Sequence, residues 1–135
     1  MRPRLIIDAS VGVHLALGLE STGKILDILE DTALLMAPGL YFTEVANALW
    51  KYVAHEEIER DEAVLLLTDA CSLIDQPISH HALTEEALVA ATAYHHPVYD
   101  MLYAVLARRH GAGVLTFDRR LRRVLKRMGV EIIEI

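Results

Sequence analysis

The sequence contains few residues that could cross-link the chain or bind a transition metal. Its 135 residues include one cysteine, Cys71, which excludes an internal disulfide bond and a cysteine-based zinc cluster. The seven histidines form no HExxH pattern. Adjacent histidines, such as His80 and His81, point in different directions on a helix or strand, so they make a poor metal site. We therefore expect stability to come from a hydrophobic core.

Long apolar runs are also absent, and none approaches the roughly 20 residues that a membrane-spanning helix needs. The first residues lead directly into a strand-like segment without the apolar region of a signal peptide. We therefore expect no membrane segment and a cytoplasmic location. With 53% hydrophobic and 24% charged residues, the chain is expected to fold as one globular domain over residues 1–135.

The net charge of −6 argues against a protein that coats nucleic acid through its overall charge. The basic residues are nevertheless unevenly distributed, because eight of the 13 lysines and arginines lie between Arg108 and Arg127. Within this stretch, Arg119, Arg120 and Arg123 flank the apolar positions of an expected helix. They form either a solvated helix face or a surface that contacts RNA phosphates.

Strand-like and helix-like patterns alternate along the chain. Strands are expected at residues 5–8, 33–37, 76–79, 114–116 and 130–133, and helices at 11–19, 24–30, 43–55, 59–73, 82–94, 98–110 and 119–128. Segment 76–79 contains Pro77, which favours the edge of a sheet. The alternation predicts an α/β fold: a three-layer α/β/α sandwich around a mostly parallel sheet of about five short strands.

Four acids are expected at one edge of this sheet. Asp8 and Asp118 follow strands, whereas Glu44 and Asp100 fall in the first turns of helices. Taken singly, each has a simpler explanation as a helix cap or a solvated acid, and Ser10 is a second candidate cap for the first helix. Parallel sheets bind ligands beyond the carboxyl ends of their strands. Four carboxylates gathered there would repel one another unless a cation such as Mg²⁺ or Mn²⁺ joined them.

Three blocks of sequence resemble PIN-domain ribonucleases, and their order and the chain length resemble VapC-type toxins of prokaryotic toxin–antitoxin pairs. The blocks are IIDASV, TEVANAL and YDMLYAVLARRHGAGVLTFDRRL, and the resemblance covers essentially the whole chain. It implies a PIN-like fold in which four acids bind a divalent metal: Asp8, Glu44, Asp100 and Asp118. It also implies supporting roles for Ser10, Asn47 and Thr116. Phe117 is bulkier than the residue often found at its position in this family.

The resemblance further implies a Mg²⁺- or Mn²⁺-dependent endoribonuclease that is the toxin of a type II pair. Its expected partners are an RNA substrate, a cognate antitoxin and a second copy of itself. A PIN-like scaffold that binds RNA or protein without cutting it is the main alternative. A phosphotransfer domain with Asp8 as nucleophile fits poorly, because Ser10 stands where a phosphatase of that type carries a second aspartate.

Overall fold

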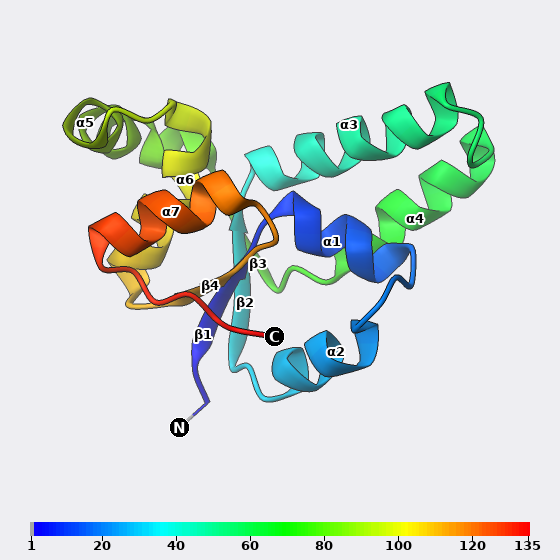
Figure 1. Cartoon of the computed structure of the whole chain (residues 1–135), viewed down its shortest axis with the longest axis horizontal. Helices are drawn as coiled ribbons and strands as arrows, with labels where there is room; N and C mark the ends of the chain where they lie inside the picture. Colours follow the sequence, from blue (N-terminus) through cyan, green and yellow to red (C-terminus); the bar gives the residue numbers. More distant parts are fainter. Residues whose placement is uncertain (1) are drawn as a thin grey trace.

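The computed structural model describes residues 2–135 and shows the predicted alternation of strands and helices (Figure 1). The elements in chain order are β1 (Arg4–Ile7), α1 (Ala9–Ala16), α2 (Thr22–Glu30), β2 (Leu34–Pro38), α3 (Leu40–Ala54), α4 (Arg60–Ser72), β3 (Gln76–Ile78), the 3₁₀ turn η1 (His80–Leu83), α5 (Thr84–Tyr94), α6 (Val98–His110), β4 (Gly113–Leu115) and α7 (Arg119–Met128). Gly111 ends α6 in the left-handed conformation, with φ of +58°, which glycine adopts without steric cost.

The four strands form one parallel sheet in the order β3-β2-β1-β4. The expected fifth strand at residues 130–133 is reduced to a single parallel bridge between Val114 and Ile132. Gly113, Val114 and Leu115 of β4 lie in register with Leu5, Ile6 and Ile7 of β1, and the backbone groups of Val114 face outward. Its N–H donates to the Glu131 carbonyl and its carbonyl accepts from Ile133, both at 2.9 Å. A three-residue strand therefore supports only one bridge at this edge.

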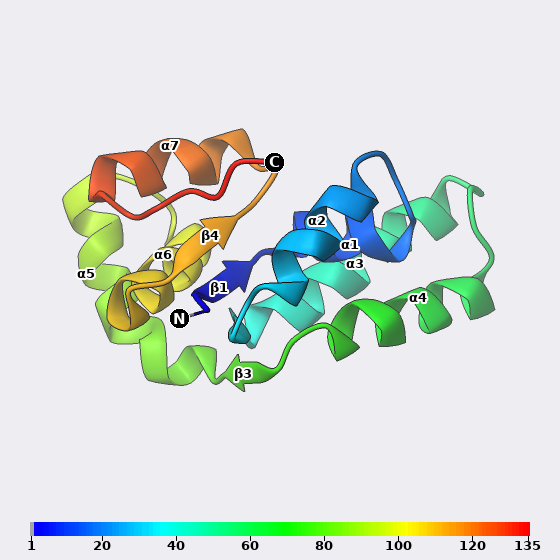
Figure 2. The same ribbon diagram turned by 90° about the horizontal axis from the view of Figure 1, so that it is seen from below.

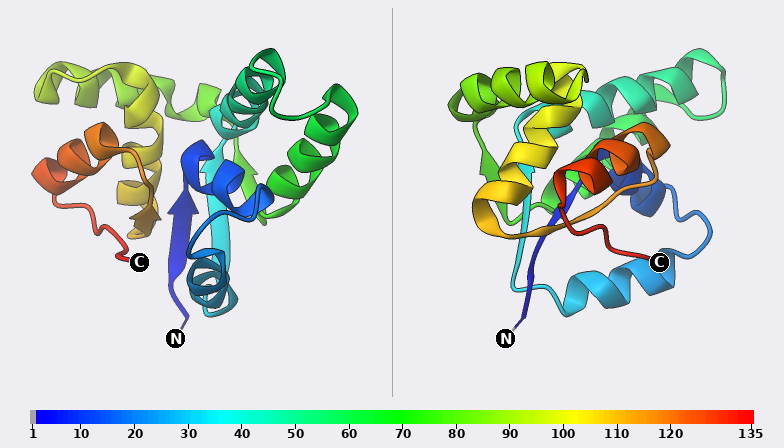
Figure 3. Two further views of the ribbon diagram at one scale, coloured as in Figure 1. Left: turned by 45° about the vertical axis from the view of Figure 1, so that its right-hand side comes forward. Right: turned by 60° about the vertical axis from the view of Figure 1, so that its left-hand side comes forward.

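Helices cover both faces of the sheet, which confirms the predicted three-layer α/β/α sandwich. Helices α5, α6 and α7 lie on one side of the sheet, and α1 to α4 lie on the other (Figures 2 and 3). Helix α6 contacts β1, β2 and β4, whereas α1 packs against β1 and α3 against β2. Among residues 2–135, no helix is both long enough and apolar enough to cross a bilayer.

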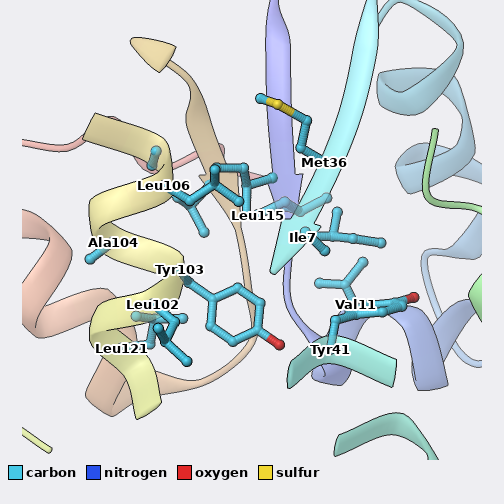
Figure 4. Close-up of a cluster of buried hydrophobic side chains, with 14 of the residues drawn as sticks. Ile7, Val11, Met36, Tyr41, Leu102, Tyr103, Ala104, Leu106, Leu115 and Leu121 are labelled. Atoms are coloured by element: carbon cyan, nitrogen blue, oxygen red, sulfur yellow. The ribbon is translucent and has the colours of Figure 1, made fainter. Parts of the chain in front are cut away.

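The core lies on both faces of the sheet, between the sheet and its covering helices. Residues Leu5 to Ile7 of β1 are buried, as expected for the apolar run of a central parallel strand. In α6 every residue from Met101 to Ala107 is buried, because this helix packs between α5, the turn η1 and the sheet (Figure 4). Because the sheet and its covering helices share one continuous core, the strand ends are held in fixed relative positions.

Helices α3 and α4 form a hairpin that is anchored by Tyr41. This buried residue packs against Gly12 of α1, where a Cβ atom would collide with the tyrosine ring, and its hydroxyl donates to the Ala70 carbonyl at 2.8 Å. Packing of Tyr41 lets α3 begin at Leu40, three residues earlier than predicted, so Glu44 lies in the second turn and not the first. Trp50 on α3 is 62% exposed.

Candidate active site

Asp8 lies at the carboxyl end of β1 and is 6% exposed. Its carboxylate caps α1 by accepting from the Val11 N–H at 3.3 Å, so Asp8, and not Ser10, is the cap of this helix. The Ser10 hydroxyl instead donates to Asp8 Oδ1 at 2.5 Å, and the Thr116 hydroxyl donates to Oδ2. Both expected supporting hydroxyls therefore contact this carboxylate, one from its own helix and one from the end of the neighbouring strand.

Burial is the largest influence on the Asp8 carboxyl and raises its pKa above the ordinary 3.8. Hydrogen bonds from Ser10, Thr116 and Val11 lower the pKa, because they stabilise the charged form, and the charge of Asp118 raises it again. The net direction is upward. Asp8 is thus an acid whose negative charge is costly in the folded protein unless a cation compensates it.

Asp118 follows β4 and caps α7. Its Oδ1 accepts from the backbone N–H groups of Arg120 at 2.9 Å and Leu121 at 3.3 Å. The two supporting hydroxyls also hold this loop, since the Phe117 N–H donates to Ser10 Oγ at 3.1 Å and the Asp118 N–H donates to Thr116 Oγ1 at 3.0 Å. The same hydroxyls therefore join the ends of β1 and β4 and fix Asp118 relative to Asp8.

Glu44 approaches the site from α3. It is partly buried, and its Oε1 accepts a hydrogen bond from the hydroxyl of Tyr103 on α6 at 2.6 Å. Burial raises the pKa of Glu44 and the Tyr103 hydrogen bond lowers it, whereas the charges of three acids raise it further: Asp8, Asp100 and Asp118. Glu44 is therefore close enough to the other three candidate acids for their negative charges to raise its pKa.

Asp100 lies in the first turn of α6, as predicted, and pairs with His96 in the segment between α5 and α6. The His96 Nε2 and Asp100 Oδ2 atoms are 2.7 Å apart, and the two side chains are 9% and 21% exposed. This histidine reaches Asp100 because the chain between α5 and α6 is short. Asp100 thus presents a carboxylate at the same sheet edge with one oxygen already engaged.

The structure brings the four predicted acids to one edge of the sheet but does not gather them tightly. In the part of the chain that is described, no three Asp, Glu, His or Cys side chains lie close enough together to hold one metal ion. Their donor chemistry nevertheless suits a hard divalent cation, since all four contribute carboxylate oxygens and no lysine or arginine is among the groups that lower the pKa of Asp8 or Glu44.

Sequence reasoning missed two residues that contact the candidate acids. Tyr103 lies in the core, 1% exposed, with its hydroxyl on Glu44. In Figure 4 its ring extends from α6 toward α3. His96 was assigned no role. Its position four residues before Asp100 is a helical spacing, but the break at Pro97 hid that signal.

The remaining predicted residues surround the acids. Asn47 is exposed on α3, nearly one turn after Glu44. Arg119, Arg120 and Arg123 are exposed on α7, directly after Asp118. Among the described residues these three arginines make no ion pair, unlike Arg122, which pairs with Glu134 at 2.9 Å.

A groove opens beside the acids between α1 and α3, with a volume of about 810 Å³. Ser10 and His14 lie on its α1 wall, and Glu44, Asn47 and Lys51 lie on its α3 wall. Tyr99 and Phe117 complete it from the start of α6 and from the loop before α7. The site is therefore open to a ligand much larger than a metal ion.

Comparison with known proteins agrees with this geometry. Residues 5–126 match the PIN domain family. The chain is 29% identical over 121 residues to Ribonuclease VapC3 of Pyrobaculum aerophilum, a match that covers 87% of this chain and 92% of that protein. The crystal structure of PAE2754 from the same organism superposes with a TM-score of 0.70 at 25% identity, covering 96% of this chain and 98% of that one. The resemblance seen in the sequence is thus confirmed, and the chain belongs to the PIN-domain family.

Proposed function

We propose that this protein is a divalent-metal-dependent endoribonuclease that hydrolyses RNA phosphodiester bonds and acts as the toxin of a type II toxin–antitoxin pair. Membership of the PIN-domain family and the similarity to Ribonuclease VapC3 support a ribonuclease of a toxin–antitoxin system. The metal dependence, the residues that carry it and the role as a toxin are our proposal. The proposed substrate is RNA, so the proposed site of action is the cytoplasm.

The observation that carries the proposal is the position of Glu44, which accepts a hydrogen bond from the Tyr103 hydroxyl at 2.6 Å and lies at the sheet edge near the other three acids. Burial is the largest influence that raises the pKa of Glu44, the charges of the three other acids raise it further, and the one group that lowers it is a neutral tyrosine hydroxyl. A purely structural acid at this position would be expected to pair with a cationic side chain. A group of acids that lack a cationic partner has the charge needed to bind Mg²⁺ or Mn²⁺.

We assign the metal-binding and catalytic role to Asp8, Glu44, Asp100 and Asp118. A divalent ion held there would supply a nucleophilic water at neutral pH and offset the negative charge that develops on the phosphoryl group. Ser10 and Thr116 orient the Asp8 carboxylate through their hydrogen bonds. Asn47, on the α3 wall of the groove, is placed to donate its amide N–H to substrate oxygen.

The exposed arginines Arg119, Arg120 and Arg123 are assigned to RNA phosphate contact. They follow Asp118 directly and are free of ion pairs within the described residues, so their charge is available to a polyanion. They would attract RNA toward acids that otherwise repel it. The other proposed partners are a cognate antitoxin and a second copy of this chain, which together would regulate access to the site.

Cleavage of labelled RNA tests the proposal directly. The wild-type protein, free of antitoxin, is incubated with Mg²⁺ or Mn²⁺ and compared with the Asp100→Asn variant and with an EDTA control. Asp27→Asn is the matched control, because it makes the same chemical change at an exposed position on α2. We expect cleavage by the wild type and by Asp27→Asn only, with unchanged circular dichroism for both variants. Metal-independent cleavage that survives in Asp100→Asn would refute the assignment.

The role as a toxin has a separate test. Expression of the chain alone should arrest growth of the host, and co-expression with a small DNA-binding protein encoded beside it should restore growth and yield a complex that co-purifies. Arrest should disappear in the Asp100→Asn variant if it results from RNA cleavage. Normal growth with active nuclease in the cell would remove the toxin assignment and leave the nuclease assignment intact.

A non-catalytic PIN-like scaffold is the second candidate, and one observation favours it. The described residues do not place three acidic or histidine side chains within reach of a single ion. Calorimetric titration with Mn²⁺ separates the two functions. Binding that disappears in Asp8→Asn supports the nuclease, whereas the absence of binding, together with tight RNA binding and no cleavage, supports the scaffold.

A further inference from the structure

We propose that the groove between α1 and α3 binds an unpaired stretch of RNA, and that Phe117 and Tyr99 provide the surfaces on which its bases stack. This inference rests on the proposed ribonuclease function and adds to it the two residues that would position unpaired nucleotides beside the scissile phosphate. Two exposed aromatic rings, each next to a candidate acid in the chain, carry the argument.

The size and walls of the groove suit a nucleotide chain. Its volume of about 810 Å³ is more than twice that of the other cavities described, which are near 230–280 Å³. Along its α3 wall lie Glu44, Asn47 and Lys51, spaced so that they share one helix face. Lys51 is about 10 Å from Glu44 along the helix axis. A cation at that distance is placed to bind a phosphate other than the one that is cut.

The aromatic rings of Tyr99 and Phe117 are exposed at the groove and are not buried in the core. Tyr99 is 66% exposed and Phe117 is 39% exposed, whereas the core tyrosines Tyr41 and Tyr103 are 0% and 1% exposed. Tyr99 directly precedes Asp100 and Phe117 directly precedes Asp118. Both rings are therefore attached to the backbone beside candidate catalytic acids, where a base next to the scissile phosphate would lie.

The Phe117 ring is held in place before any ligand binds. It packs on the His14 ring with centroids 4.5 Å apart and planes inclined at 36°, and a nitrogen of that imidazole hydrogen-bonds to the Glu20 carbonyl. The Phe117 N–H is fixed by Ser10. An aromatic ring that is anchored on one side and exposed on the other provides a stacking surface at little entropic cost.

These features favour unpaired RNA over a duplex. Bases in an A-form helix are already stacked on one another, so only unpaired bases can stack on a protein ring. Glu44 on the α3 wall, with Lys51 further along the same wall, also suits a ligand whose charge is carried on spaced phosphates. The groove therefore selects for a loop, a bulge or a single strand.

The test measures RNA binding without cleavage. Fluorescence anisotropy in EDTA compares wild type with Phe117→Leu and Tyr99→Leu, using a short unstructured RNA, the same RNA with one abasic position, and a hairpin stem of equal length. Trp50→Leu is the matched control, because Trp50 is an aromatic residue about as exposed as Tyr99 and more exposed than Phe117, and it lines a different cavity, between α3 and α4. We expect each groove variant to weaken binding of the unstructured RNA about tenfold and the control to leave it unchanged.

The abasic RNA and the hairpin stem provide further tests of base stacking in the groove. Stacking would be supported if the wild type bound the abasic RNA more weakly than the intact RNA. The difference between the two RNAs should then be smaller for Phe117→Leu than for the wild type. The inference would be overturned if all variants bound the RNA equally well, if the stem bound more tightly than the unstructured RNA, or if no RNA bound at all. It would also be overturned if the groove variants kept their affinity for RNA and lost only the binding of a protein partner. If RNA binding follows the expected pattern but the protein supplied with Mg²⁺ or Mn²⁺ cuts no RNA, the nuclease proposal fails and the groove assignment survives. If the protein cuts RNA and neither groove variant changes the KM, the groove assignment fails and the nuclease proposal survives.

Discussion

The two halves of the candidate site are held in different ways. Asp8 and Asp118 are fixed by hydroxyls and backbone N–H groups at the ends of adjacent strands β1 and β4. Glu44 and Asp100 each depend on one side chain, Tyr103 on α6 and His96 before it. The first half is thus built into the sheet, and the second half depends on how α3, α5 and α6 pack together.

The two pairs of acids therefore depend on different kinds of contact: pairing of neighbouring strands for Asp8 and Asp118, and side-chain hydrogen bonds for Glu44 and Asp100. Strand pairing fixes Asp8 and Asp118 because Thr116 lies at the end of the strand that pairs with β1. The Tyr103–Glu44 hydrogen bond instead joins residues 59 positions apart on two helices. We therefore expect the sheet half to tolerate little change and the helix half to respond in a graded way when its supporting side chains are altered.

The largest effect is expected for Asp8→Asn. The substitution keeps the size and shape of the side chain but removes the most buried of the four charges. We expect cleavage of labelled RNA in Mn²⁺ to fall to the level of the EDTA control and calorimetric Mn²⁺ binding to disappear, with the circular dichroism spectrum unchanged. Retention of most of the wild-type activity would show that the sheet half is not the centre of the site.

The next effect concerns Tyr103→Phe, with Tyr41→Phe as its matched control. Each tyrosine is buried and donates one hydrogen bond, so each substitution should lower the free energy of unfolding by about 1 kcal/mol in urea denaturation. Only Tyr103 holds a candidate ligand. Residues that orient metal ligands typically contribute about 10- to 100-fold to affinity, so we expect Mn²⁺ to bind Tyr103→Phe about 10-fold more weakly. Equal Mn²⁺ affinities in the two variants would show that Tyr103 is structural.

A smaller effect is expected for charge reversal on α7, the helix that Asp118 caps. Arg119→Glu and Arg123→Glu should weaken RNA binding while leaving Mn²⁺ affinity close to that of the wild type. Each lost phosphate contact should reduce the slope of log affinity against log salt by about one. Anisotropy across a salt series provides the measurement, and a slope equal to the wild-type value would exclude these arginines from the RNA surface.

The smallest effect is the pH dependence of the metal-free protein. Burial raises the pKa of Asp8 above 3.8, and burial together with neighbouring acids raises that of Glu44 above 4.5. The folded state therefore keeps protons that the unfolded chain has already lost. The resulting stabilisation is fully present below the ordinary carboxyl pKa values and is lost as the pH rises through the raised ones. In EDTA, the free energy of unfolding should fall with pH more steeply in the wild type than in Asp8→Asn, and identical slopes would contradict the shift at Asp8.

Local sequence patterns predicted most of the secondary structure but not the details at element ends. The apolar run before Asp8 and the glycine at position 111 correctly predicted β1 and the end of α6. The predicted start of α3 was wrong, and of the two candidate caps of α1 it is Asp8, not Ser10, that caps the helix. Both depend on partners distant in sequence: Tyr41 packs against α1 and α4, and the Ser10 hydroxyl is held between Asp8 and the Phe117 N–H.

By itself the sequence determined the alternation of strands and helices, the apolar core and the four acids at the ends of strands and the starts of helices. It did so because periodicity, turn residues and the order of elements act over short distances along the chain. The tertiary structure alone decided which neighbours each acid has. Tyr103 reaches Glu44, and Tyr99 and Phe117 line one groove, because side-chain contacts across packed helices depend on the positions of whole elements, which no local pattern encodes.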